Sequence, residues 1–120
     1  MCGIAGIFHL ETPKPVDPAR VEAMCDAIAH RGPVFNGEIY NFQELRQELK
    51  SAGATFRTDG DSEVILAAWQ RWGPDCVTRL HGMFAFAIYD LDARTLFLAR
   101  DRLGVKPLYL APLSDGSLAF

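Results

Sequence analysis

The chain opens with Met1-Cys2-Gly3-Ile4-Ala5-Gly6-Ile7-Phe8, in which a cysteine directly follows the initiator methionine. Cysteine is small enough for the initiator Met to be removed, which would leave the thiol and a free α-amine on Cys2. An α-amine titrates near pH ~7.7–8.0, so it can accept the thiol proton close to neutral pH. Such a residue can act as a nucleophile that uses its own amine as the base. The apolar residues around the two glycines predict a buried strand.

The same stretch has a plainer interpretation. A free cysteine is often a small buried apolar residue, and Cys2 could be one on an ordinary N-terminal strand. These residues alone leave both interpretations open, so the rest of the chain has to decide between them.

Composition sets the class of protein. With 120 residues, of which 49% are hydrophobic and eight are Phe, the chain predicts one domain with a sizeable core. The net charge of -3, without a basic run, argues against nucleic acid or an anionic membrane as the main partner. No apolar stretch is long enough to cross a bilayer, and a basic signal-peptide region is lacking, so we expect a cytoplasmic protein. The three cysteines, Cys2, Cys25 and Cys76, have neither disulfide-framework nor zinc spacing.

Hydrophobic periodicity predicts alternating helices and strands, with strands dominating the last third. Helices are expected between Asp17 and His30, between Asn41 and Gly53, from Val64 to Trp72 and from Pro74 to Leu80. Strands are expected over residues 4–8, 54–58, 83–89, 95–100, 108–111 and 118–120. The stretch 83–89 is almost continuously apolar, which is typical of a strand buried on both faces.

Asn36-Gly37 follows Phe35, which is expected to end a strand. Asn-Gly is a strong signal for a tight turn without a chemical task. The alternative is that the Asn36 amide and the Gly37 N–H form an oxyanion hole, which would stabilise the negative oxygen formed when a thiol attacks a carbonyl.

Two acidic residues lie at the starts of the later helices. Glu44 is placed to form a capping pair with Asn41. Asp61 is placed to be an N-cap, or alternatively to pair with the ammonium group of a ligand. The run that starts at Asp59 resembles a calcium loop, but its twelfth position is Gln70 instead of Glu, which argues against one.

Four pieces then occur in order along the chain: Met1-Cys2-Gly3-Ile4-Ala5-Gly6, His30-Arg31-Gly32-Pro33, Phe35-Asn36-Gly37-Glu38-Ile39-Tyr40-Asn41 and Arg100-Asp101-Arg102-Leu103-Gly104-Val105-Lys106-Pro107-Leu108-Tyr109. Together they resemble the N-terminal glutaminase domain of glutamine-hydrolysing asparagine synthetases. These are class II glutamine amidotransferases of the N-terminal-nucleophile (Ntn) hydrolase superfamily. The resemblance covers essentially the whole chain and favours the nucleophile interpretation of Cys2.

The resemblance implies an α+β fold, a four-layer αββα sandwich of two antiparallel sheets. It implies that Cys2 attacks the side-chain amide of glutamine while Asn36 and Gly37 hold the oxyanion. Glu38 and Asp61 match family positions that recognise the α-amino end of glutamine. No metal or other cofactor is expected for this domain.

The family also implies partners. In the whole enzyme, ammonia passes to a C-terminal synthetase domain that activates aspartate with ATP and Mg. That domain is absent from residues 1–120, so we expect a glutaminase domain that is truncated at its C-terminus. Exposed apolar surface where the missing parts would pack could promote self-association into a homodimer.

The chain departs from the family after Pro33, which runs directly into Val34. The family usually has a sizeable stretch there, with an arginine that clamps the glutamine α-carboxylate. Arg31 matches a different motif and is no safe replacement. We therefore expect weak glutamine binding, because a missing bidentate clamp removes a strong charge-assisted contact.

Two other functions remain as alternatives. One is a catalytically silent domain that serves folding or docking to a synthetase partner, which the gap after Pro33 favours. The other is an Ntn amidohydrolase or amidotransferase that acts on another substrate.

Overall fold

The computed structural model describes residues 7–9, 35–90 and 93–120, and within them an α+β arrangement with two antiparallel sheets. The strands are β1 (Ile7–His9), β2 (Phe35–Ile39), β3 (Gly82–Asp90), β4 (Thr95–Arg100), β5 (Ala111–Pro112) and β6 (Ser117–Ala119). The helices are α2 (Phe42–Ser51), α3 (Asp61–Trp72), the 3-10 turn η1 (Gly73–Asp75) and α4 (Cys76–Arg79). The expectation of an α+β fold with two antiparallel sheets is confirmed.

The first sheet has the order β2-β3-β4, with β3 in the centre. Five consecutive residues of β3, from Phe84 to Ile88, are buried, which confirms the prediction of a strand buried on both faces. Because side chains alternate along a strand, Phe84, Phe86 and Ile88 share one face and the small alanines between them share the other.

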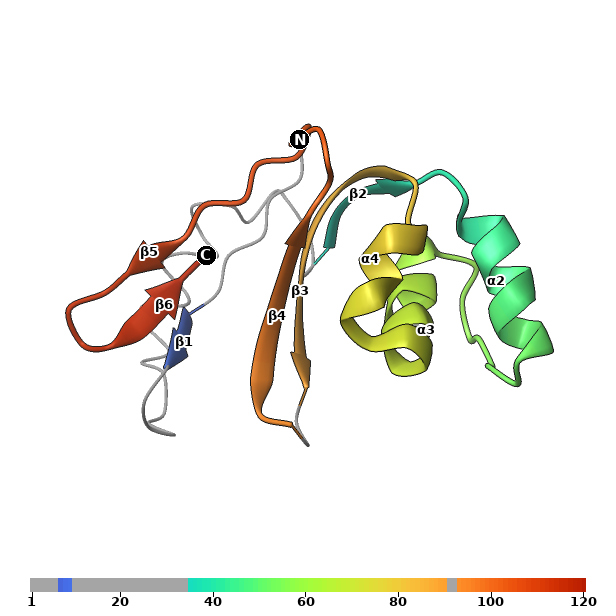
Figure 1. The fold of residues 1–120 in the computed structure, drawn as a ribbon, viewed down its shortest axis with the longest axis horizontal. Helices are drawn as coiled ribbons and strands as arrows, with labels where there is room; N and C mark the ends of the chain where they lie inside the picture. Colours follow the sequence, from blue (N-terminus) through green and yellow to red (C-terminus); the bar gives the residue numbers. More distant parts are fainter. Residues whose placement is uncertain (1–6, 10–34, 91–92) are drawn as a thin grey trace.

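The second sheet has the order β1-β6-β5, so the N-terminal strand pairs with the end of the chain. Ile7 lies opposite Ala119 in this antiparallel pair. This sheet lies on the opposite side of β3 and β4 from the helices (Figure 1). The predicted helix between Asp17 and His30 lies outside the described residues, so the four-layer sandwich stays an expectation.

One hydrophobic core joins the helices to the first sheet. Residues at helical spacing face inward from α2 and α3, as the periodicity predicted. The buried helical residues are Leu45, Leu49, Val64, Ile65, Ala68 and Cys76. Trp69 of α3 packs on Phe97 of β4 with ring centroids 4.6 Å apart, which ties the helical layer to the far strand of the sheet.

Two of the predicted strands were wrong in whole or in part. Residues 54–58 form a loop instead of a strand, because their backbone groups bond to side chains of the flanking helices. In the 108–111 stretch, only Ala111 belongs to a strand, β5.

Asn41 and Glu44 form no capping pair, although Asn41 is the N-cap residue of α2. The Asn41 side chain bonds instead to the backbone between the end of α4 and the start of β3: its Nδ2 donates to the Arg79 carbonyl at 2.9 Å and its Oδ1 accepts from the His81 N–H at 2.9 Å. A tertiary contact has replaced the local cap that the sequence suggested.

Among the described residues, no helix combines the length and the apolar character needed to cross a membrane.

We expect Leu49→Ala to lower the free energy of unfolding by about 2–5 kcal/mol, because it opens a cavity under a buried side chain. Leu49 is 1% exposed, whereas Leu103 is 90% exposed. Leu103→Ala is the control, with an expected change within about 0.5 kcal/mol. Urea unfolding of both variants checks this, and equal losses would contradict the described core.

Candidate active site

Three of the predicted site residues, Asn36, Gly37 and Glu38, lie next to one another on β2. They pair with β3, where Ala85, Phe84 and Met83 lie opposite them in that order. The interpretation of Asn36-Gly37 as a tight turn is therefore wrong. The dipeptide lies inside a strand because β3 provides a backbone partner along its whole length.

Gly37 is a position that no side chain can occupy. Its φ is +144°, and a Cβ there would lie 2.0 Å from the Met83 carbonyl oxygen and 2.7 Å from the Phe84 Cα. The two strands approach closely because the Cβ is missing. Gly82 repeats the arrangement, since a Cβ on it would lie 2.1 Å from the Glu38 carbonyl oxygen.

The Asn36 side chain is buried without a matching partner. It is 2% exposed, and its Oδ1 has no hydrogen-bond partner within the part of the chain that the structure describes. A buried polar group left unsatisfied costs about 1–3 kcal/mol. Oδ1 is an acceptor, so a group that satisfied it would have to be a hydrogen-bond donor, whereas the Nδ2 of the same side chain is the donor that an oxyanion would need.

Asp61 is the residue that brings α3 to this strand. Its Oδ2 accepts a hydrogen bond from the Ile39 N–H at 3.2 Å, next to Glu38. The N-cap of α3 is Gly60 and Asp61 is the first helical residue, so the N-cap interpretation of Asp61 is wrong. Asp61 thus lies at the end of β2 that carries Glu38.

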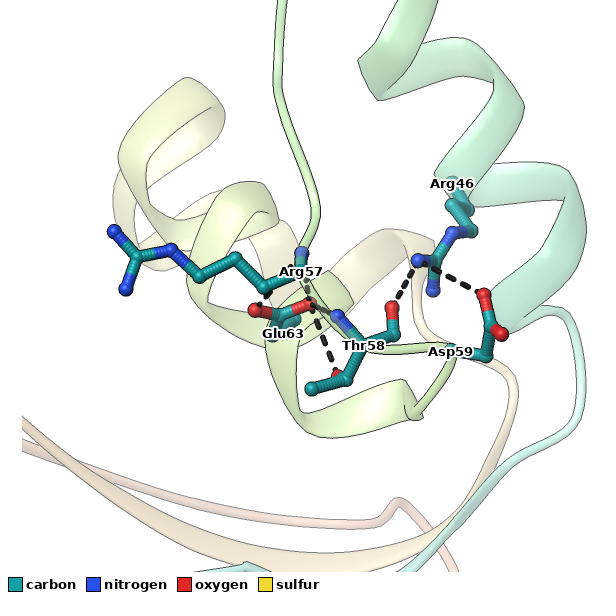
Figure 2. A network of polar contacts seen from close by, with 5 residues as sticks. All are labelled: Arg46, Arg57, Thr58, Asp59 and Glu63. Carbon is teal, nitrogen blue, oxygen red and sulfur yellow. Dashed lines mark hydrogen bonds and ion pairs between the residues drawn. The ribbon is translucent and has the colours of Figure 1, made fainter.

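The loop before α3 is held by Glu63 from the first turn of that helix. Its Oε2 accepts hydrogen bonds from the Arg57 N–H at 3.0 Å, the Thr58 N–H at 2.8 Å and the Thr58 hydroxyl at 3.0 Å. Figure 2 shows these contacts converging on the Glu63 carboxylate. They resemble a capping box that reaches back beyond the N-cap.

Arg46 of α2 holds the same loop from the other side (Figure 2). Its guanidinium donates to the Thr58 carbonyl, lies 3.4 Å from the Asp59 carboxylate and stands 4.5 Å from the centre of the Phe56 ring. Because the loop is fixed from both helices, the start of α3, and with it Asp61, has a defined position relative to β2.

The same contacts favour the ionised form of the Glu63 carboxyl. The backbone N–H of Thr58 is the main cause that lowers the pKa of the Glu63 carboxyl below its ordinary value. The ionised form is therefore the one that the folded chain stabilises.

The sequence patterns alone assign no role to Arg46 or Glu63. The signal for Glu63 was its place three residues after Gly60, the N3 position of a helix, but its reach past the N-cap depends on how the loop folds.

Cys2, the predicted nucleophile, lies outside the described residues. Within residues 7–9, 35–90 and 93–120, no three His, Cys, Asp or Glu side chains lie close enough together to hold a metal ion.

Comparison with known proteins places these residues in a family. The glutamine amidotransferase domain family matches residues 34–120, so the chain belongs to this family. The membership confirms the resemblance that the four motifs indicated, to the glutaminase domains of glutamine-hydrolysing asparagine synthetases.

Three relatives illustrate the similarity. The putative asparagine synthetase [glutamine-hydrolyzing] of Mycobacterium tuberculosis (strain ATCC 25618 / H37Rv) is 55% identical over 85 residues, which are 70% of this chain and 13% of that protein. Asparagine synthetase B [glutamine-hydrolyzing] of Escherichia coli (strain K12) is 47% identical over 83 residues, 69% of this chain and 15% of that protein. Asparagine synthetase [glutamine-hydrolyzing] 2 of Bacillus subtilis (strain 168) is 31% identical over 154 residues, 94% of this chain and 20% of that protein.

The chain thus spans between 13% and 20% of the length of these relatives. The alignment of 154 residues is longer than this chain of 120, so that relative contains residues without a counterpart here.

We expect the carboxylate of Glu63 to stabilise the fold in a pH-dependent way. Because its pKa is lowered on folding, its contribution is present above the ordinary glutamate pKa of about 4.3 and is lost as the pH falls through the folded value. Glu63→Gln should therefore unfold more easily than the wild type at neutral pH, and the difference should shrink in acid.

Urea unfolding between neutral pH and pH ~3 measures this difference. Glu44→Gln, at an exposed carboxylate in the first turn of α2, is the matched control. A difference for Glu63→Gln that stays constant down to the lowest pH would show that the charge of Glu63 has no part in holding the loop.

Proposed function

We propose that this chain is a glutaminase domain that hydrolyses glutamine to glutamate and ammonia. The observation that carries the proposal is the junction of β2 and α3, where the Ile39 N–H bonds to the Asp61 carboxylate. Through that bond Asp61 lies beside the strand that carries Asn36, Gly37 and Glu38. Asn36 and Gly37 have N–H groups that could donate to an oxyanion, and Glu38 has a carboxylate that could bind an ammonium group. Membership in the glutamine amidotransferase family supports it.

In the proposed mechanism, the α-amine of Cys2 takes the thiol proton and the thiolate sulfur attacks the side-chain amide carbon of glutamine. The Asn36 amide and the Gly37 N–H donate hydrogen bonds to the oxyanion that develops. Collapse of this intermediate breaks the C–N bond, and the α-ammonium returns its proton to the leaving ammonia. Water then attacks the γ-glutamyl thioester, releasing glutamate and restoring the thiol.

Recognition of the substrate is assigned to the two carboxylates. The α-ammonium of glutamine is a cation, and Asp61 and Glu38 bring two negative charges to the same end of β2. An ion pair that is also hydrogen-bonded is roughly twice as strong as a neutral hydrogen bond. Asp61 and Glu38 would therefore strengthen the binding of glutamine, while Asn36 and Gly37 would stabilise the transition state.

The other end of the substrate lacks an assigned partner. We propose that a segment with the arginine that clamps the α-carboxylate is missing between Pro33 and Val34. The family match starts at residue 34, and an alignment longer than the chain supports a missing segment. Glutamine binding should accordingly be weak, and Arg31 is not proposed as a substitute.

Ammonia made at this site would serve a synthetase domain in the longer enzyme. The names of the relatives support asparagine synthesis as the use of this ammonia. We propose aspartate as the acceptor, with ATP and Mg needed only in that other domain. A cytoplasmic location fits this role.

The missing segment also favours a second function, a catalytically silent domain that is kept for folding or for docking to a synthetase partner. An amidase for another substrate would retain the Cys2 chemistry but not the selectivity for glutamine.

The electrophilic glutamine analogue 6-diazo-5-oxo-norleucine tests the nucleophile. We expect one adduct by intact mass, mapped to Cys2, in a chain that has lost Met1. Cys2→Ser is the control and should stay unmodified. A folded, Met-free chain that gives no adduct would contradict the glutaminase proposal and favour the silent domain.

Asp61→Asn tests substrate recognition. The amide oxygen can still accept the Ile39 N–H, but the negative charge is lost. A hydrogen bond to a charged group contributes about 1.5–3 kcal/mol, so we expect KM for glutamine to rise about tenfold or more, with a much smaller change in kcat.

Asp75→Asn removes a charge from an exposed residue of η1 and serves as the matched control, with unchanged kinetics. Steady-state glutaminase assays measure both variants. A fall in kcat at constant KM for Asp61→Asn would show that Asp61 acts on the chemical step instead of on binding.

A further inference from the structure

Asp101 is a buried carboxylate that the proposed mechanism does not use. It follows the last residue of β4 and is 6% exposed. Four backbone N–H groups donate to it: Phe84 at 3.3 Å, Leu103 at 3.1 Å, Val105 at 2.9 Å and Lys106 at 3.0 Å. Three of these donors belong to the loop that follows Asp101, but the fourth belongs to β3.

The contact with β3 is made twice. The Asp101 N–H also donates to the Phe84 carbonyl at 2.7 Å, so both backbone groups of Phe84 are bonded to one residue. Phe84 is therefore held from the β4 side through the backbone and the side chain of Asp101.

On its other side, Phe84 lies opposite Gly37 in the pairing of β2 with β3. The packing there is tight, because a Cβ on Gly37 would lie 2.7 Å from the Phe84 Cα. A shift of Phe84 toward or away from β2 would therefore change the place of the Gly37 backbone.

We propose that Asp101 is a positioning residue for the oxyanion donors, acting through Phe84 on Gly37. It touches no reacting atom; it fixes the strand against which Gly37 is packed. The inference rests on the proposed function, since it needs the Gly37 N–H to be an oxyanion donor.

The chemistry of the side chain suits this task. Burial opposes the charged form, but the N–H groups of Lys106, Val105, Phe84 and Leu103 outweigh it and hold the pKa of Asp101 below its ordinary value. Only an ionised carboxylate has acceptor sites for all four donors, which is why Asn at this position would leave some of them unmatched.

A purely local role for Asp101 would be to fold the loop 101–106. Arg100 separates the two roles, because its Nε donates to the Lys106 carbonyl at 2.9 Å and its Nη2 to the Gly104 carbonyl at 2.7 Å. Arg100 is exposed and its side chain holds the same loop without the hydrogen bond to Phe84. Arg100→Met is therefore the matched control that loosens the loop alone.

The test compares Asp101→Ala with Arg100→Met in glutaminase kinetics and in the backbone amide NMR signals of Phe84 and Gly37. A misplacement of about 1 Å can cost about a hundredfold in rate. We expect Asp101→Ala to lower kcat at least tenfold with little change in KM, and to shift both signals. Arg100→Met should change neither kcat nor the Gly37 signal.

If Asp101→Ala does not fold, Asp101→Asn takes its place. In any folded variant in which the amide signal of Phe84 shifts, the amide signal of Gly37 must also shift and kcat must fall. A Phe84 signal that moves while Gly37 and kcat do not, or a kcat that falls equally in Arg100→Met, would overturn the proposal.

The NMR comparison separates this inference from the proposed function. A wild-type chain without glutaminase activity would contradict the proposed function. Coupled shifts of Phe84 and Gly37 would still support the positional link, and uncoupled shifts would overturn it.

Discussion

The close backbone contact between β2 and β3 organises the candidate site. Gly37 and Gly82 allow it, because a Cβ at either position would lie about 2 Å from a carbonyl oxygen of the other strand. The contact places Asn36, Gly37 and Glu38 in one extended segment against the central strand of the core. It also makes the geometry of that segment sensitive to whatever fixes β3, and Asp101 is the residue that bonds to β3 at Phe84.

A second set of contacts fixes the other half of the candidate site. Arg46 and Glu63 hold the loop before α3 from two helices, and Asp61 follows directly from that loop. The hydrogen bond from the Ile39 N–H to Asp61 then joins the helix to β2. Both halves rely on backbone N–H groups bonded to carboxylates, at Asp101 in one and at Glu63 and Asp61 in the other, and such supporting bonds hold a site in place.

Much of this could be predicted from the sequence where a pattern is local. The bounds of β4 and the buried faces of α2 and α3 follow from hydrophobic periodicity, and the four ordered motifs indicate the family.

The predictions that were wrong concern groups whose bonding partners are far away in the chain. Asn36-Gly37 has the composition of a turn, and only pairing with β3 makes it a strand. Asn41 and Asp61 are residue types that often cap helix N-termini, yet the side chains of both bond to another part of the chain. Asp101 belonged to a recognised motif, but its contact with Phe84 needs the register of two strands.

We propose that β2, with Asn36 and Gly37, forms the oxyanion side of a site built around Cys2. The most direct measurement is a crystal structure of the chain after reaction with 6-diazo-5-oxo-norleucine. We predict that the carbonyl oxygen of the Cys2 adduct lies within hydrogen-bond distance of the Asn36 Nδ2 and the Gly37 N, with its α-amino group facing Asp61. An adduct on Cys2 whose oxygen points away from β2 would contradict the role of Asn36 and Gly37 as oxyanion donors.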